Sequence, residues 1–177
     1  MLKSLFRNAA NRQVIGVIHG KIVAAARQPA LYADYGVPDT LEGRFELVTL
    51  HAMLVLRVLR HAPQPGPHLA QDVSNAVFAG FDADLREMGV GDVILPKRIN
   101  RLVEAFIGRC AAYEAALGDP NDSPLEIALN RNIYAPRSGD ASRLARYARA
   151  CAAQLARLAP DKPASESINF AAAADIA

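Results

Sequence analysis

Apolar residues recur every three or four positions along most of the chain, a spacing that predicts amphipathic helices rather than strands. The densest run covers residues 42–60, where apolar side chains surround the predicted helix except along one narrow stripe. The stripe is formed by Glu42, Glu46, Thr49, Met53, Arg57 and Arg60. A helix that is apolar on most sides packs against neighbours on several sides. We therefore expect this helix to be central and largely buried.

Capping and helix-breaking residues mark both ends of this helix and the end of the next one. Asp39 or Thr40 is placed to cap the start of the first, and the proline-rich stretch 61–67 after it is expected to be a surface loop. A second apolar face covers residues 73–88, and Gly89 directly after it is suited to a helix C-cap.

Three further helices are expected in the second half of the chain. Pro96 is suited to the first turn of a helix that continues to about residue 118. Ser123 begins a short helix to about residue 133, and a last helix covers roughly 139–158.

These elements predict an all-α fold: a single-domain bundle of about six helices over residues 1–160, with a flexible tail over 161–177. The composition agrees, because Trp is absent, Phe and Tyr are few, and Ala supplies much of the 51% hydrophobic content. A chain of 177 residues suffices for one core and is short for two independent domains.

Charge is unevenly distributed along the chain, although its net value is only +2. Residues 1–33 contain five basic side chains and no acidic one, and we expect 1–29 to form a basic helical arm. The arm is attracted to anionic lipid or ribosomal RNA, or it is an ordinary packed helix with a solvated face. Gly16 and Gly20 weaken this helix or permit close packing. Residues 72–92 hold five acids against Arg86 alone, and the small net charge argues against specific DNA binding.

Three residues interrupt otherwise apolar helix faces. His51 projects opposite the polar stripe, so it is either a hydrogen-bonded core histidine, which we favour, or it faces a cavity. Asp84 lies at the edge of an apolar face and requires a partner, for which Arg44 and Arg109 are candidates. Gly108 suggests close approach of another backbone.

Catalytic and metal-binding patterns are absent from the sequence. No glutamate is followed by histidine at the di-iron spacing, no HExxH, GxSxG or phosphate-loop pattern occurs, and Cys110 and Cys151 lack metal or redox spacing. We expect no catalytic residue, metal or cofactor. The longest uncharged apolar run spans ten residues, against about 20 for a transmembrane helix, and a reduced cytoplasmic location fits.

Two ordered segments, YGVPDTLEGRFELVTLH from Tyr35 and FDADLREMGVGD from Phe81, are followed by PKRINRLVEAFIGRCAAYEAAL from Pro96. Together they resemble the ubiquinol-cytochrome c chaperone family over roughly residues 30–118. The resemblance implies a non-catalytic α-helical chaperone that binds newly synthesised cytochrome b and promotes assembly of the ubiquinol-cytochrome c reductase complex. It also implies a peripheral place at the inner membrane and, as further partners, a second assembly factor or the ribosome.

Side-chain chemistry in this family context divides the matched region into two sets. The expected partner-binding residues are Tyr35, Arg44, Phe45, Leu85, Arg86, Met88, Val90, Lys97 and Arg98. The expected structural residues are Gly36, Asp39, Thr40, Gly43, Asp82, Asp84, Glu87, Gly89, Gly91, Asp92, Gly108, Arg109 and Tyr113. The alternative is a helical protein that binds or transforms haem, quinone or lipid, since helical bundles commonly host such ligands.

Overall fold

The computed structural model describes residues 2–135, 139–157 and 164–177, and over residues 2–10 it describes the backbone alone. All regular structure in these ranges is helical, which confirms the all-α prediction. The helices are α1 (Leu2–Ala26), α2 (Pro29–Ala33), α3 (Leu41–His61), α4 (Gly66–Glu87), α5 (Leu95–Gly118), α6 (Ser123–Leu129), α7 (Ala141–Leu155) and α8 (Ala164–Ser167). A π-helical turn, Asn130–Tyr134, extends α6, and a 3-10 turn, Ala173–Asp175, lies near the C-terminus. Among the described helices, six have seven residues or more.

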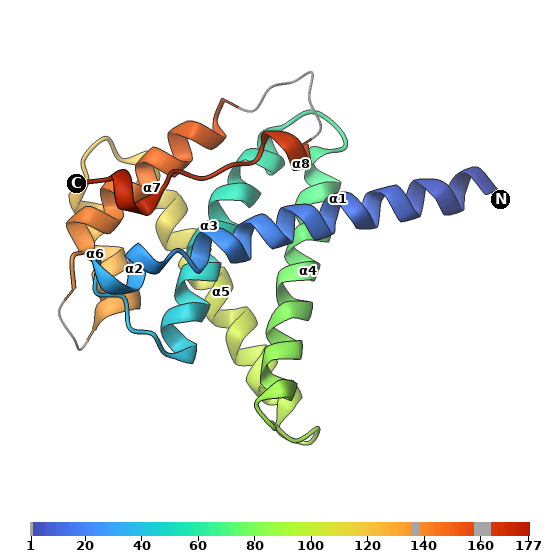
Figure 1. Ribbon diagram of the computed structural model, residues 1–177, viewed down its shortest axis with the longest axis horizontal. Coiled ribbons are helices and arrows are strands. Elements are labelled where there is room, and N and C mark those ends of the chain that lie inside the picture. The colour runs from blue at the N-terminus through green and yellow to red at the C-terminus, as the bar shows by residue number, and fades with distance from the viewer. Residues whose placement is uncertain (1, 136–138, 158–163) are drawn as a thin grey trace.

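Helix α3 lies at the centre of the bundle, in contact with α1, α4, α5 and α7 (Figure 1). Leu47, Leu50 and Leu54 are fully buried, and the predicted central position of this helix is confirmed. The predicted polar stripe is not solvated along its length, because Glu46 and Thr49 are also buried. Helix α5 packs against α3, and Arg109 of α5 pairs with Glu46 of the stripe.

The predicted caps of α3 and α4 are both present. Thr40 precedes α3, and its Oγ1 accepts a hydrogen bond from the Gly43 amide at 3.2 Å. Gly89 follows α4 with a φ of 77°, and its amide bonds to the Arg86 carbonyl at 2.9 Å. The Val90 amide reaches the Leu85 carbonyl at 3.1 Å, which completes a Schellman motif. This turn directs the chain back toward α5.

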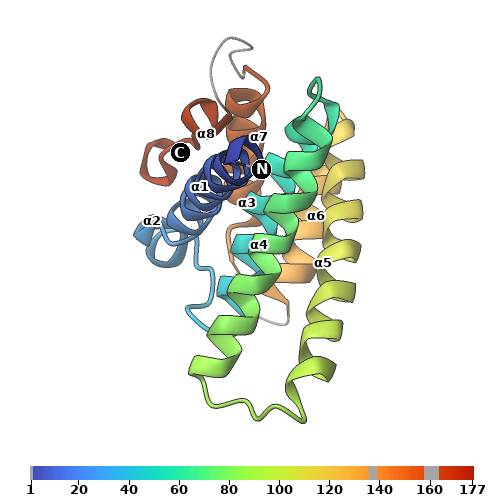
Figure 2. The same cartoon turned by 90° about the vertical axis from the view of Figure 1, so that its right-hand side faces the viewer.

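Helices α4 and α5 form a hairpin that projects beyond the rest of the bundle (Figures 1 and 2). They lie side by side and are joined at the far end by residues 88–94. The hairpin is held to the body mainly through α3. Its outer end is therefore exposed on several sides.

The second half of α1 is packed against the body of the protein. Ile18 and Ile22 are fully buried, and the helix contacts α3 and α4. A Cβ at Gly16 or Gly20 would have no heavy atom within 4 Å, so the suggestion of close packing there is wrong, as it is for Gly108 on α5. These glycines lie on open faces of their helices. Contact of the basic arm with lipid or ribosome stays a prediction.

Residues 164–177 pack along α1, α2 and α7 rather than forming the expected flexible tail (Figure 1). Ile168 and Ala173 are fully buried, and the Ala173 carbonyl accepts a hydrogen bond from the Tyr35 hydroxyl at 2.7 Å. Lys21 Nζ donates to the Ile168 carbonyl at 2.8 Å. Such isolated anchors leave no periodic signal in the sequence. We correct the prediction for 164–177; residues 161–163 lie outside the described ranges.

A buried hydrogen-bond network links the central helix to the C-terminal segment. His51 is fully buried, and its Nδ1 lies 2.7 Å from the Leu47 carbonyl, which only accepts, so Nδ1 carries the proton. The Tyr147 hydroxyl then donates to His51 Nε2 at 2.8 Å and accepts from Gln28 Nε2 at 3.0 Å. Gln28 Oε1 in turn accepts from the Ala173 amide at 2.7 Å. The prediction of a satisfied core histidine is confirmed.

Candidate functional site

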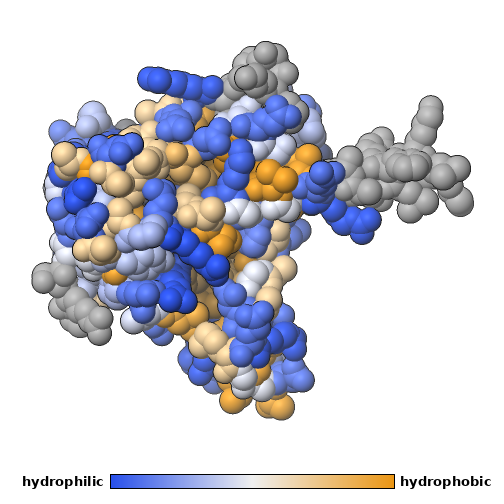
Figure 3. Space-filling model, in the orientation of Figure 1, coloured by the Kyte–Doolittle hydropathy of each residue, from blue (hydrophilic) through white to orange (hydrophobic). Residues whose placement is uncertain are grey.

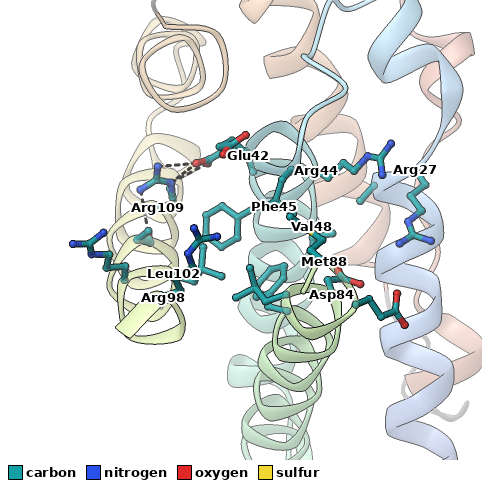
Figure 4. Close-up of a pocket in the computed structure, with 18 of the residues that line it drawn as sticks. Arg27, Glu42, Arg44, Phe45, Val48, Asp84, Met88, Arg98, Leu102 and Arg109 are labelled. Carbon is teal, nitrogen blue, oxygen red and sulfur yellow. Dashed lines mark hydrogen bonds and ion pairs between the residues drawn. The ribbon is translucent and has the colours of Figure 1, made fainter. Parts of the chain in front are cut away.

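A groove of about 720 Å³ opens where α3, α4 and α5 separate toward the projecting hairpin (Figure 4). Its floor is apolar and is formed by Phe45, Val48, Phe81, Leu85 and Leu102. The Phe45 and Phe81 rings pack with centroids 5.0 Å apart, and Phe78 and Phe106 pack behind them at the same separation. Arg27 and Tyr32 border the groove on the side of α1 and α2. The floor thus rests on the aromatic part of the core.

The two walls that flank this floor carry opposite charge. Helix α4 contributes Asp84 and Glu87, and α5 contributes Arg98 and Arg101. All four side chains are exposed, and none forms an ion pair within the described parts of the chain. The acidic cluster noted in the sequence therefore does not neutralise the basic start of α5. Charges on an occupant can pair with each wall while apolar side chains face the floor.

A buried ion pair anchors the inner end of the groove. Glu46 on α3 is 5% exposed and is bound by the Arg109 guanidinium. Arg109 Nε lies 2.7 and 2.9 Å from the two carboxylate oxygens, and Nη2 lies 2.7 Å from Oε1. Burial raises the pKa of Glu46, and the guanidinium opposes that rise; the same contact raises the pKa of Arg109. The pair ties α5 to α3 beside the groove.

We expect Arg109→Leu to lower the free energy of unfolding at neutral pH by about 2 kcal/mol. This is less than the ~3–5 kcal/mol typical of a fully buried pair that loses one partner, because Arg109 is 27% exposed. Without the guanidinium the Glu46 pKa rises further above its unfolded value, so the loss should shrink as the pH is lowered and the carboxyl becomes protonated. Urea denaturation at neutral and mildly acidic pH measures both effects.

A matched pair of variants separates this explanation from simple loss of packing. Glu46→Leu/Arg109→Leu should be more stable than Arg109→Leu alone, because no unpaired carboxylate remains. Arg44→Leu breaks an exposed pair and should change stability little. Equal losses in all three variants would show that the buried charge of Glu46 is not the cause.

The proposed partner for Asp84 must be corrected. Asp84 is exposed at the groove, whereas Arg109 pairs with Glu46, and Arg44 pairs with Asp39 at 2.7 and 2.8 Å. The Arg44 hydrogen bond lowers the pKa of Asp39. Helix α4 extends past the start of α3, so the edge of its apolar face borders the groove rather than the core. A helical projection cannot show where the neighbouring helix ends.

The structure brings five of the predicted partner-binding residues together at the groove: Arg44, Phe45, Leu85, Met88 and Arg98. Arg86, Val90 and Lys97 lie in the same hairpin but outside the groove lining. Arg86 instead donates to Asp82 at 2.7 Å and to Asp92 at 2.8 Å. Contact of these residues with a partner stays a prediction.

Tyr35 is a predicted partner-binding residue that the structure buries away from the groove. It is 1% exposed, its hydroxyl bonds to the C-terminal segment, and its carbonyl accepts from the Tyr134 hydroxyl at 3.0 Å. We therefore correct its assignment to the partner surface. From the sequence, an aromatic residue beside turn residues was compatible with either the core or the partner surface.

Several predicted structural residues have visible roles in holding backbone or core. Gly36 has a φ of 71°, a left-handed conformation that favours glycine. Tyr113 is fully buried, and its hydroxyl accepts from Asn132 Nδ2 at 3.3 Å. Glu87 instead lines the groove, and Gly91 has open space around it.

Sequence reasoning missed several groove residues: Arg27, Tyr32, Leu41, Glu42, Glu46, Val48, Phe81, Arg101 and Leu102. They come from four separate segments that only the packing brings together. For Glu46 one signal existed, because it is an acid within a helix that is apolar on most sides. That signal identified a buried helix but not the buried acid.

The groove offers ion pairing and apolar contact rather than a recognisable reactive centre. Its described lining contains no histidine, cysteine, serine or threonine. Across the described residues, no three or more His, Cys, Asp and Glu side chains form a group that could hold a metal ion. Of the described helices, none combines the length and apolarity needed to cross a membrane. The protein is thus a helical bundle with an apolar groove between charged walls.

Comparison with known proteins identifies the family. Residues 33–170 match the ubiquinol-cytochrome C chaperone family, and this chain belongs to it. The crystal structure of the Cbp3 homolog from Brucella abortus is similar over 100% of both chains, with 34% identity and a TM-score of 0.86. Comparison with curated proteins found no match. The resemblance seen in the sequence is confirmed: the chain is a member of the chaperone family for ubiquinol-cytochrome c reductase.

Proposed function

We propose that this protein acts by binding, without catalysis, and that its groove captures an apolar segment of newly synthesised cytochrome b during assembly of the ubiquinol-cytochrome c reductase complex. The family match supports the assembly role. One observation carries the choice of site: a groove with an apolar floor of buried and half-buried side chains lies between exposed walls of opposite charge. Apolar helices of an unassembled membrane protein aggregate unless they are shielded.

The size of the groove indicates what it can cover. A volume of about 720 Å³ lies within the ~300–1,000 Å³ range of ligand-sized sites. A membrane-spanning helix of about 20 residues is roughly 30 Å long, so the groove takes one face of a few turns. Met88, 55% exposed at the rim, supplies a flexible contact that adapts to different side chains.

We place the protein in the cytoplasm at the inner membrane surface, where its client is inserted. The basic α1 arm is a candidate contact for anionic lipid or the ribosome, and a second assembly factor is a candidate partner. The family and the charge of the arm support these assignments.

The test is capture of cytochrome b made by cell-free translation in detergent micelles, scored by crosslinking to the purified chaperone. Reversal of one wall, Arg98→Glu/Arg101→Glu or Asp84→Lys/Glu87→Lys, should weaken capture roughly tenfold, since each loses favourable pairs and gains repulsion. The four residues are exposed, so folding should be retained. Arg157→Glu, an exposed reversal away from the groove, is the matched control.

Two results would count against this function. Capture unchanged by either wall reversal in folded protein would remove the groove from the client interface. Purified protein that carries stoichiometric haem, quinone or lipid, with no affinity for cytochrome b, would favour the small-molecule alternative.

A further inference from the structure

The outer end of the α4–α5 hairpin presents aliphatic side chains to solvent. Val93 is 95% exposed and Ile94 is 55% exposed, and both lie in the connection at the end of the projection. Figure 3 shows hydrophobic surface at this end. Neither residue lines the groove. We name residues 91–94 the hairpin apex.

The apex is held in a defined conformation. The Ile94 and Leu95 amides both bond to the Gly91 carbonyl, at 2.9 and 3.0 Å. Leu95 is 3% exposed and anchors the start of α5, while Arg86 holds Asp92 at 2.8 Å. Val93 and Ile94 therefore project outward from a fixed turn, although neither contributes to the core. Such exposure of adjacent large aliphatic side chains marks an interaction site.

We propose that the hairpin apex inserts Val93 and Ile94 into the surface of an anionic lipid bilayer. The apex is convex and projects from the body, a shape that enters a lipid interface but offers no pocket to a partner side chain. Residues 93–103 contain Lys97, Arg98 and Arg101 and no acid, so basic groups follow the aliphatic pair within the first turns of α5. Lysine and arginine near an anionic surface strengthen binding to it.

The surrounding acids are compatible with this contact. Asp92, the acid nearest the aliphatic pair, is paired with Arg86, which also holds Asp82. Asp84 and Glu87 lie further along α4 on the groove wall. The residues that follow the aliphatic pair on α5 are thus basic, whereas the acids unpaired within the described residues lie on α4 across the groove.

Insertion would also place the groove beside the bilayer. Met88 and Arg98 line the groove and lie in the same end of the hairpin as the apex. The inference goes beyond client binding, and it rests on the proposed function only for this last consequence, that a segment leaving the membrane meets the groove directly.

Fluorescence tests the insertion directly, because the natural chain contains no tryptophan. With vesicles of phosphatidylglycerol and phosphatidylcholine in equal parts, Val93→Trp should shift its emission to shorter wavelength and be quenched by brominated acyl chains. Ile127→Trp, at an aliphatic position that is 65% exposed on α6, should do neither. An unshifted Val93→Trp in vesicle-bound protein would assign binding to the basic arm and overturn the proposal.

Vesicle co-sedimentation gives a second measurement. Val93→Asp/Ile94→Asp should weaken binding at least tenfold, and Lys97→Glu should weaken it on anionic vesicles only. The control Ile107→Asp/Ile127→Asp changes two aliphatic residues outside the apex that are 61% and 65% exposed, and this variant should bind normally. If the apex variant keeps its vesicle binding but fails to capture cytochrome b in micelles, the apex is a protein contact and the lipid assignment is wrong. Loss of vesicle binding with normal capture leaves the groove function intact.

Discussion

Replacement of Gly43 by alanine is expected to lower the free energy of unfolding by about 3 kcal/mol, at the upper end for overpacking a tight site. A Cβ at this position would lie 1.9 Å from the Pro38 carbonyl oxygen, and the nearby atoms are backbone rather than a flexible side chain. The same turn positions Thr40 as the α3 cap. Relief of the clash must therefore move the segment that starts the central helix.

Thermal and urea denaturation of Gly43→Ala measure this effect, and Gly16→Ala is the matched control. Gly16 lies within α1 with no atom near its missing Cβ, so alanine there should stabilise the protein by about 1 kcal/mol through helix propensity. For a chain of this length, the Gly43 loss corresponds to roughly 10 °C in Tm. Similar changes in both variants would show that the Pro38 carbonyl is not the cause.

The Gly43 turn bears on the proposed function because the groove floor begins on the same helix turn. Phe45 and Val48 line the groove, and Glu46 between them holds Arg109. A displaced start of α3 would move all of these together. We expect the contact between Pro38 and Gly43 to set the position of Phe45 in the groove floor.

Acidification is expected to remove about 3 kcal/mol of stability through His51 alone. Burial lowers the pKa of this imidazole from 6.5 to about 4, so between these values the unfolded chain binds a proton that the folded protein does not. The stability contribution is complete above pH 6.5 and is lost progressively as the pH falls toward 4. Each pH unit in this window costs about 1.4 kcal/mol.

Comparison with His51→Gln isolates this effect. Glutamine cannot titrate, so the variant should be less stable at neutral pH yet show a flatter loss of stability on acidification. His19, whose pKa burial also lowers, and Glu46, whose pKa burial raises, are present in both proteins and cancel in the difference. Urea midpoints across the acidic range provide the measurement. Parallel loss of stability in the two proteins would rule out His51 as the titrating group.

The network around His51 also explains why the C-terminal segment packs. Tyr147 and Gln28 connect the imidazole to the Ala173 amide, and Phe170 packs edge-on to the His51 ring with centroids 5.0 Å apart. Polar groups that are far apart in the chain thus satisfy one another's hydrogen-bonding capacity in the core. Burial raises the pKa of Tyr147, which keeps its hydroxyl as a donor to the imidazole.

Local chemistry in the sequence was sufficient to predict the elements and the family. The cap at Thr40, the glycine turn at Gly89 and the apolar run of α3 each depend on residues within one or two turns, and the structure confirms all three. His51 was predicted as a satisfied core residue from its own helix alone, because it projects opposite the polar stripe. The ordered segments that carry the family resemblance are likewise read directly from the chain.

Tertiary packing decided which residues meet. Glu46, Asp84 and Tyr35 were each compatible with two environments, and the choice depended on where neighbouring helices lie and end. The groove, the buried Glu46–Arg109 pair and the packed C-terminal segment all join residues distant in sequence. The sequence by itself determined the longer helices, the ends marked by Thr40 and Gly89, and the family, because those signals are local. Only the tertiary structure decided the groove, its charged walls and the exposed hairpin apex, because burial and pairing belong to contacts between helices.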